Sequence, residues 1–156
     1  MKPVVVIGLG NPLMTDEGIG NRVVAEVAAA ADRFPEAECL DLGTSGMAVL
    51  HALAGRRKAI LLDCAFMGEA PGTLRRFTPQ EVRSGKLERG FTMHEGDLLQ
   101  FVELARAVSD APEEIVIFGI QPEDVSPGEG LSATLAARVG EYAEVILAEL
   151  AGSARG

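Results

Sequence analysis

The chain has 156 residues, of which 47% are hydrophobic, so it is long enough to bury one core and has the usual size of one domain. Its 14 basic and 23 acidic residues give a net charge of −9, which argues against nucleic acid or an anionic membrane as the main partner. No apolar run reaches transmembrane length, the start lacks a signal-peptide pattern, and the two cysteines, Cys39 and Cys64, fit a reducing compartment. We therefore expect a single cytoplasmic domain over residues 1–156.

Apolar periodicity predicts strands that alternate with helices along the chain. In chain order we expect a strand at 4–9, a helix at 16–33, a strand at 38–42, a helix at 47–53, a strand at 59–63, a short edge or antiparallel strand at 72–77, a polar mobile loop at 79–93, a helix at 97–108, a strand at 114–120 and a last helix from an N-cap at Ser132 through Leu150. This order predicts a three-layer αβα fold with a twisted, mostly parallel sheet of about five strands.

The ends of the first three predicted strands indicate where a ligand would bind. In parallel sheets of this kind, ligands bind beyond the carboxyl ends of the strands. The loop at 10–17, the loop at 41–46 and Asp63 each follow or end one of these strands. We therefore expect them to converge at one edge of the sheet.

The first of these loops, within VVVIGLGNPLMTDEGIG at residues 4–20, is rich in glycine but also acidic. Gly8 and Gly10 match the first two glycines of a dinucleotide fingerprint, whereas Leu13 occupies the third position. Asp16 and Glu17 would repel a pyrophosphate at the start of the next helix. The turn therefore argues against a dinucleotide, and the chain contains no phosphate-binding loop of the Gly-Lys-Ser/Thr kind.

A phospho-receiver domain is an alternative with a similar arrangement of acids. It carries an acidic pair after its first strand and an aspartate after its third, which here would be Asp16, Glu17 and Asp63. It also needs a lysine after its last strand, and this chain has no lysine beyond residue 86. The receiver-like interpretation is therefore the less favoured one.

A metal site is the remaining interpretation of Glu17, Asp63 and His94. Two carboxylates and an imidazole suit a first-row divalent ion, and three protein ligands leave positions for water or substrate. Each residue also has a structural interpretation, because acids stabilise a helix N-terminus and a single histidine is usually a surface or capping residue. Asp63 is the hardest to explain in this way, since a charge at the end of an apolar strand needs a partner.

Two other reactive side chains are expected to be structural. His51 lies in the predicted helix at 47–53, and we interpret it as a packing residue. Cys64 follows Asp63, and the alternation of a strand places its thiol on the opposite face. We therefore expect Cys64 to be buried rather than nucleophilic.

The blocks GLGNPL and DEGIG at residues 8–20 resemble the opening motif of the hydrogenase maturation proteases, peptidase family M52. These endopeptidases trim the C-terminal extension from the large subunit of nickel–iron hydrogenases. Further blocks resemble the other signatures of the family in the same order: DLGTSG at 41–46, LLD at 61–63, TMH at 92–94, GIQP at 119–122 and GLS at 130–132. Cys64 and Met93 are small departures that remove no functional residue.

The resemblance implies that Glu17, Asp63 and His94 are catalytic and contact a metal. It implies that this metal is nickel, which arrives bound to the hydrogenase large-subunit precursor and is not a resident cofactor. The precursor is then the partner, and the loop that helps to select it contains Asp41, Gly43, Thr44 and Gly46.

The expected reaction is hydrolysis of one peptide bond in the precursor. The ion could polarise the scissile carbonyl or lower the pKa of a bound water, and the residues leave open which carboxylate acts as general base. The glycines of the first loop are expected to let the chain pass close to the cation. A non-catalytic nickel-dependent checkpoint or chaperone remains an alternative to a protease.

Overall fold

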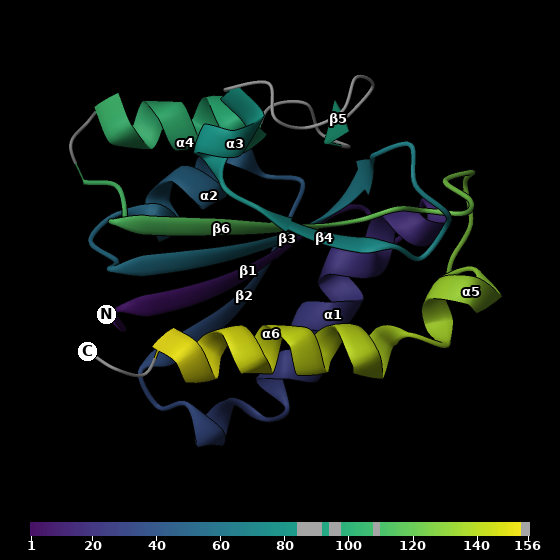
Figure 1. The fold of residues 1–156 in the computed structure, drawn as a ribbon, viewed down its shortest axis with the longest axis horizontal. Coiled ribbons are helices and arrows are strands. Elements are labelled where there is room, and N and C mark those ends of the chain that lie inside the picture. Colours follow the sequence, from purple (N-terminus) through teal and green to yellow (C-terminus); the bar gives the residue numbers. More distant parts are fainter. Residues whose placement is uncertain (84–91, 94–97, 108–109, 154–156) are drawn as a thin grey trace.

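The computed structural model describes residues 1–83, 92–93, 98–107 and 110–153. Within them, one sheet has the strand order β2-β1-β3-β6-β4 (Figure 1). These strands are β1 (Val4–Leu9), β2 (Ala37–Gly43), β3 (Lys58–Phe66), β4 (Leu74–Phe77) and β6 (Glu114–Ile120). Neighbouring strands from β2 to β6 are parallel, whereas β4 is antiparallel at the edge and β5 (Thr92–Met93) pairs with the end of β3.

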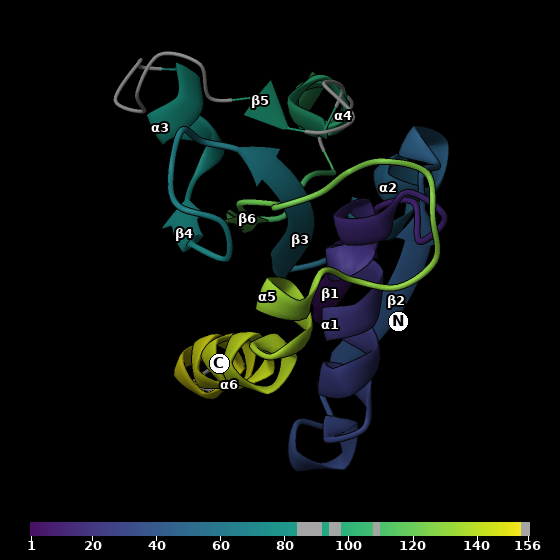
Figure 2. The same cartoon turned by 90° about the vertical axis from the view of Figure 1, so that its right-hand side faces the viewer.

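Helices cover both faces of the sheet (Figures 1 and 2). One face carries α1 (Ile19–Ala28), α5 (Ala133–Ala136) and α6 (Val139–Ser153), and the other carries α2 (Gly46–Leu53), α3 (Pro79–Arg83) and α4 (Leu98–Ala107). A buried apolar cluster lies under each layer of helices. The predicted three-layer αβα fold with a mostly parallel sheet is therefore confirmed.

The central strand β3 shows why the sequence folds in this way. Ile60 and Leu62 belong to the cluster beneath α1 and α6, while Ala59 and Leu61 belong to the cluster on the α2 side. Such a strand needs apolar side chains on both faces, which gives the continuous apolar run visible in the sequence. No helix in the described parts of the chain is long and apolar enough to cross a membrane.

Several predicted elements differ from the observed ones. The predicted helix at 16–33 consists of the 3-10 turn η1 (Thr15–Gly18), helix α1 and the 3-10 turn η2 (Ala31–Arg33). Strand β3 continues past residue 63 to Phe66, where it pairs with β5. The predicted loop at 79–93 contains α3 and β5, and its residues 84–91 lie outside the described part of the chain.

The last predicted helix is interrupted between α5 and α6. Its N-cap is confirmed, because the hydroxyl of Ser132 accepts a hydrogen bond from the backbone N–H of Leu135. The buried residues Leu135, Val139 and Tyr142 keep a helical spacing across the interruption. Apolar periodicity therefore indicates the buried face but not the break.

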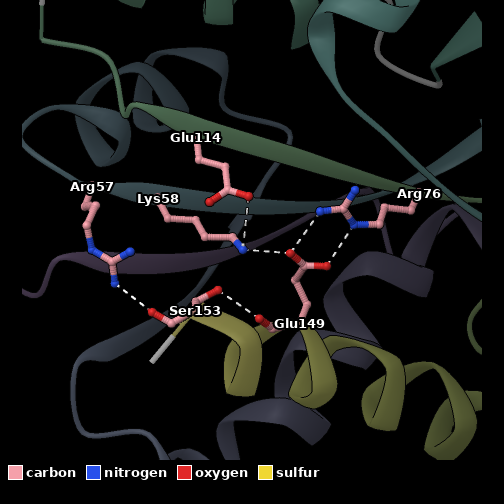
Figure 3. Close-up of polar contacts among 6 residues, drawn as sticks. All are labelled: Arg57, Lys58, Arg76, Glu114, Glu149 and Ser153. Carbon is pink, nitrogen blue, oxygen red and sulfur yellow. Dashed lines mark hydrogen bonds and ion pairs between the residues drawn. The ribbon is translucent and has the colours of Figure 1, made fainter. Parts of the chain in front are cut away.

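An ion-pair network ties α6 to the sheet (Figure 3). The Lys58 side chain is only 4% exposed, and its Nζ lies 2.7 Å from Glu149 Oε2 and 3.4 Å from Glu114 Oε2. Arg76 donates two hydrogen bonds to Glu149, at 2.8 and 3.1 Å. The hydrogen bonds from Arg76 and then from Lys58 lower the pKa of Glu149 to about 2, against the opposing effect of burial.

Candidate functional site

The carboxyl ends of β1, β2 and β3 converge at one edge of the sheet, as predicted. The turn η1 is the element that follows β1, and the N–H of Gly10 donates a 2.9 Å hydrogen bond to the carbonyl of Gly43 at the end of β2. The pairing of β1 with β3 ends at Leu62, so Asp63 is the first residue of β3 beyond β1. The candidate site is therefore built from these three strand ends.

Asp63 does not end its strand, which corrects the sequence-based expectation. It is fully buried, pairs in register with Gly119 of β6, and accepts a 2.8 Å hydrogen bond from the N–H of Cys64 through Oδ1. The strand continues because β6 and then β5 provide partners after β1 has ended. Strand alternation places Asp63 on the same face as Leu61 and Ala65.

Asp16 and Glu17 lie on η1 and not in the first turn of α1. Asp16 is fully buried, and Glu17 is 6% exposed. The acid turn, as we call η1, contacts β3. The turn therefore brings two buried acidic residues to the edge of the sheet where Asp63 lies.

The acids at this edge of the sheet all act on the thiol of Cys64. Burial is the main cause that raises the pKa of this thiol, and the negative charges of Asp63, Glu17 and Asp16 raise it further. Cys64 is fully buried in the same apolar cluster as Leu62. The prediction of a packed, non-nucleophilic cysteine on the face opposite Asp63 is therefore confirmed.

Asp16 has a role that the sequence did not reveal. Its Oδ2 accepts hydrogen bonds from the N–H groups of Glu123 at 2.9 Å and Asp124 at 3.0 Å, and its Oδ1 accepts one from Ser132 at 2.8 Å. These donors lie between 107 and 116 residues away in the chain. The Asp16 carboxylate therefore joins the acid turn to a distant segment of the chain, a role beyond that of a charge in the first turn of a helix. The available signal was that Glu123 and Asp124 directly follow the GIQP block and that Ser132 belongs to the GLS block.

The glycines of the first loop make room for the protein itself. A Cβ atom on Gly8 would overlap the carbonyl oxygen of Gly20, and one on Gly20 would overlap that of Leu9. A Cβ on Gly10 would overlap the carbonyl oxygen of Glu17. The expectation that these glycines make room for a cation is therefore wrong, because they let the acid turn and α1 pack directly on β1.

Replacing Gly10 by Ala is expected to lower the free energy of unfolding by about 3 kcal/mol, because overpacking adds to an unfavourable φ of 142°. Chemical denaturation measures this change. Gly140→Ala is the matched control, since nothing lies within 4 Å of its added Cβ in α6. That change should stabilise the protein by about 0.5–1 kcal/mol. Equal effects of the two changes would contradict the packing role of Gly10.

The structure tests the prediction for one of the two histidines, His51, but not for the other. His94 lies outside the described residues, so its approach to Glu17 and Asp63 stays a prediction. Among the residues that the structure describes, no group of three His, Cys, Asp or Glu side chains is arranged to hold a metal ion. The His51 side chain is exposed in the last turn of α2, where a basic group suits the helix dipole, so the expectation of a packing role is wrong.

Asp41 of the predicted substrate loop borders a pocket of about 320 Å³. Its Oδ1 accepts hydrogen bonds from Nδ2 of Asn21 at 2.7 Å and from the N–H of Gly43 at 3.1 Å. The pocket is also lined by residues of the first loop, of α1 and of the segment before α5, namely Pro12, Thr15, Gly18, Asn21, Arg22, Ala25, Gly130 and Leu131.

The other three residues of the predicted substrate loop run from the last residue of β2 to the first residue of α2. Gly43 has a φ of 58°, Thr44 is exposed, and Gly46 begins α2. Of the four predicted residues, Asp41 is the one that the described structure places in the wall of this pocket.

A sequence model of the family described as hydrogenase maturation protease matches residues 21–149. The chain belongs to the hydrogenase maturation protease family. It is 31% identical over 148 residues to the hydrogenase 2 maturation protease of Escherichia coli, with 94% of this chain and 90% of that protein covered. It is 28% identical to the hydrogenase expression/formation protein HoxM of Cupriavidus necator, with 90% and 70% covered.

Solved structures agree with this membership. The hydrogenase maturating endopeptidase HybD from E. coli superposes with a TM-score of 0.81 at 31% identity, covering 98% of this chain and 94% of that one. The [NiFe] hydrogenase maturation protease HybD from Thermococcus kodakarensis has a TM-score of 0.78 at 22% identity, covering 96% and 99%, and shows the shared fold. This maturation protease is therefore a peptide-bond hydrolase.

Proposed function

We propose that this maturation protease removes the C-terminal extension of a nickel–iron hydrogenase large-subunit precursor after nickel has been inserted. The observation that supports this proposal is the gathering of Glu17 and Asp63, two buried carboxylates, at the carboxyl edge of the sheet in a member of this protease family. Family membership argues against the receiver-like alternative. We also propose that the reaction takes place in the cytoplasm.

The donor chemistry of the site fits a divalent cation carried by the substrate. Glu17 and Asp63 supply carboxylate oxygens at low exposure, where a cation offsets the cost of burying charge. With His94 they would complete the coordination of the precursor's nickel and orient the scissile peptide. The nickel would supply Lewis-acid polarisation of the carbonyl or of a water. Either carboxylate of the chain can then take the proton of the attacking water.

The test is to incubate the purified protein with nickel-loaded and with nickel-free precursor, and to weigh the large subunit by mass spectrometry. We expect a shortened large subunit only from the nickel-loaded precursor. Stable binding without shortening would favour the non-catalytic checkpoint or chaperone. Equal cleavage of both precursors would contradict recognition of nickel.

Asp41→Asn is expected to change which precursor is accepted, or to slow cleavage, more than it changes stability. Asp41 is exposed at the pocket wall, so the free energy of unfolding should change by less than about 1 kcal/mol. Cleavage rates for several precursors, compared with denaturation curves, measure the two effects. Unaltered rates and selectivity would count against substrate recognition by Asp41.

The protein is expected to stay folded with no metal, since its two apolar clusters supply the core. Free Ni²⁺ at about ten times its Kd should stabilise it by about 1.4 kcal/mol, which corresponds to a Tm increase of about 3–6 °C. Thermal melts in chelator and in excess Ni²⁺ measure this. Unfolding in chelator would show a structural metal and would contradict nickel that arrives with the substrate.

A further inference from the structure

The acid turn is bound to the segment at residues 123–132 by an unusually dense set of hydrogen bonds. Besides the three accepted by the Asp16 carboxylate, the N–H of Asp16 donates to the carbonyl of Asp124 at 2.9 Å. The N–H of Thr15 donates to the carbonyl of Gly128 at 2.9 Å, and the N–H of Gly128 donates to that of Leu13 at 2.8 Å. Backbone and side chain thus join two parts of the chain that are distant in sequence.

The backbone of Thr15 is strained at this junction. It is a β-branched residue with a φ of 49°, a conformation that such residues rarely adopt. Its hydroxyl lies 2.6 Å from the carbonyl oxygen of Asp124 and 3.0 Å from that of Ser126, and its proton is shared between these acceptors. The strained conformation is therefore held by contacts with the segment at 123–132.

Glu17 lies between this junction and the sheet. On the sheet side, its carbonyl group packs where a Cβ of Gly10 would lie. On the other side, its backbone follows directly from Thr15 and Asp16, and its N–H donates to the carbonyl of Met14 at 3.1 Å. The position of the Glu17 backbone, from which its side chain extends, therefore depends on the hydrogen bonds that hold Thr15 and Asp16.

We propose that Thr15 and Asp16 are positioning residues that fix Glu17 by clamping the acid turn to the segment at 123–132. This inference rests on the proposed function in so far as Glu17 acts on the substrate. Charge-assisted hydrogen bonds from three backbone donors give the clamp its stiffness, and only a carboxylate offers acceptors to all three at once. An amide at position 16 would turn its NH₂ group toward at least one of these donors.

The kinetic test compares Thr15→Val, which keeps the shape but loses the hydroxyl, with Thr15→Ser, which keeps the hydroxyl. With nickel-loaded precursor, we expect kcat to fall about 10–100-fold in Thr15→Val and in Asp16→Asn, with KM unchanged. Thr15→Ser should keep kcat near that of the wild type. A purely structural role would lower Tm but leave kcat per folded molecule unchanged in all three variants, which would overturn the proposal.

Amide hydrogen exchange, recorded without precursor, tests the clamp independently of cleavage. Thr15→Val and Asp16→Asn should speed exchange at the N–H groups of Glu17, Glu123, Asp124 and Ser132, whereas Thr15→Ser should not. Unchanged exchange at Glu17 in the first two variants would overturn the proposal even if the precursor is cleaved. A wild-type protein that cleaves no precursor would refute the proposed function, while the exchange data would still decide for or against the clamp.

Discussion

Glu17→Gln is expected to reduce cleavage of the nickel-loaded precursor by about 10²–10⁴-fold while the protein stays folded. The amide keeps the size of the side chain but can neither take a proton from water nor neutralise a cation. Because the replacement has the same size and shape, we expect Tm to stay close to that of the wild type. The mass of the large subunit over time, together with a thermal melt, measures both effects.

The matched control is Glu26→Gln, which makes the same chemical change on the exposed side of α1. Glu26 pairs with Arg22 at 2.9 Å, and such exposed pairs contribute little to stability. This variant should cleave at the wild-type rate. Asp63→Asn and His94→Ala should behave like Glu17→Gln. A wild-type rate in Glu17→Gln, Asp63→Asn or His94→Ala would show that the assignment of these three residues is wrong.

The fold could be predicted because strands that are buried on both faces appear in the sequence as continuous apolar runs. The apolar runs of β1, β3 and β6 are buried on both faces, so they read as strands without help from neighbouring segments. The short strand β4 was placed correctly at the edge, where it pairs antiparallel with β6. The rule that parallel strands end together then brought η1, the end of β2 and Asp63 to one edge.

The remaining features depend on contacts that periodicity does not report. Helical spacing continues from α1 into η2 and across the interruption before α6, so it could not show where regular helix begins or ends. The three backbone donors to Asp16 lie more than a hundred residues away, and nothing in the local sequence indicates them. The glycines suggested a ligand because the sequence shows that a side chain is absent but not whether a cation or a helix fills the space beside it.

The candidate site was predicted partly from residues and partly from resemblance. Strand order alone indicated that Glu17 and Asp63 would lie at one edge, since both follow from the topology of a parallel sheet. Their role with His94 came from the family motif, and it stays a prediction. Asp41 was expected near the same edge, and its hydrogen bond from Asn21 of α1 gives a physical reason for its fixed position at the pocket.

Glu149→Gln is expected to lower the free energy of unfolding by about 3 kcal/mol, or Tm by about 6–12 °C. Within the described part of the chain, it would leave Lys58, 4% exposed, with only the more distant and half-exposed Glu114 as a charged partner. Urea denaturation measures the loss. The double variant Lys58→Met with Glu149→Leu is the control, because apolar replacement of both partners removes the buried charge, and it should recover most of the stability.

The effect of Glu149→Gln on the free energy of unfolding should disappear in acid, because the pKa of Glu149 is lowered in the folded protein. This pKa is lowered from 4.5 to about 2 in the folded protein, so the ionised form stabilises the fold above pH 4.5, and this stabilisation is lost as the pH falls toward 2. Because Arg76 is 46% exposed, screening reduces the contribution to about 2–3 kcal/mol at neutral pH. The difference in unfolding free energy between wild type and Glu149→Gln, measured from pH 7 to pH 2, should therefore shrink below pH 4.5 and approach zero near pH 2. A difference that stayed constant to pH 2 would mean that the charge of Glu149 does not hold α6 to the sheet.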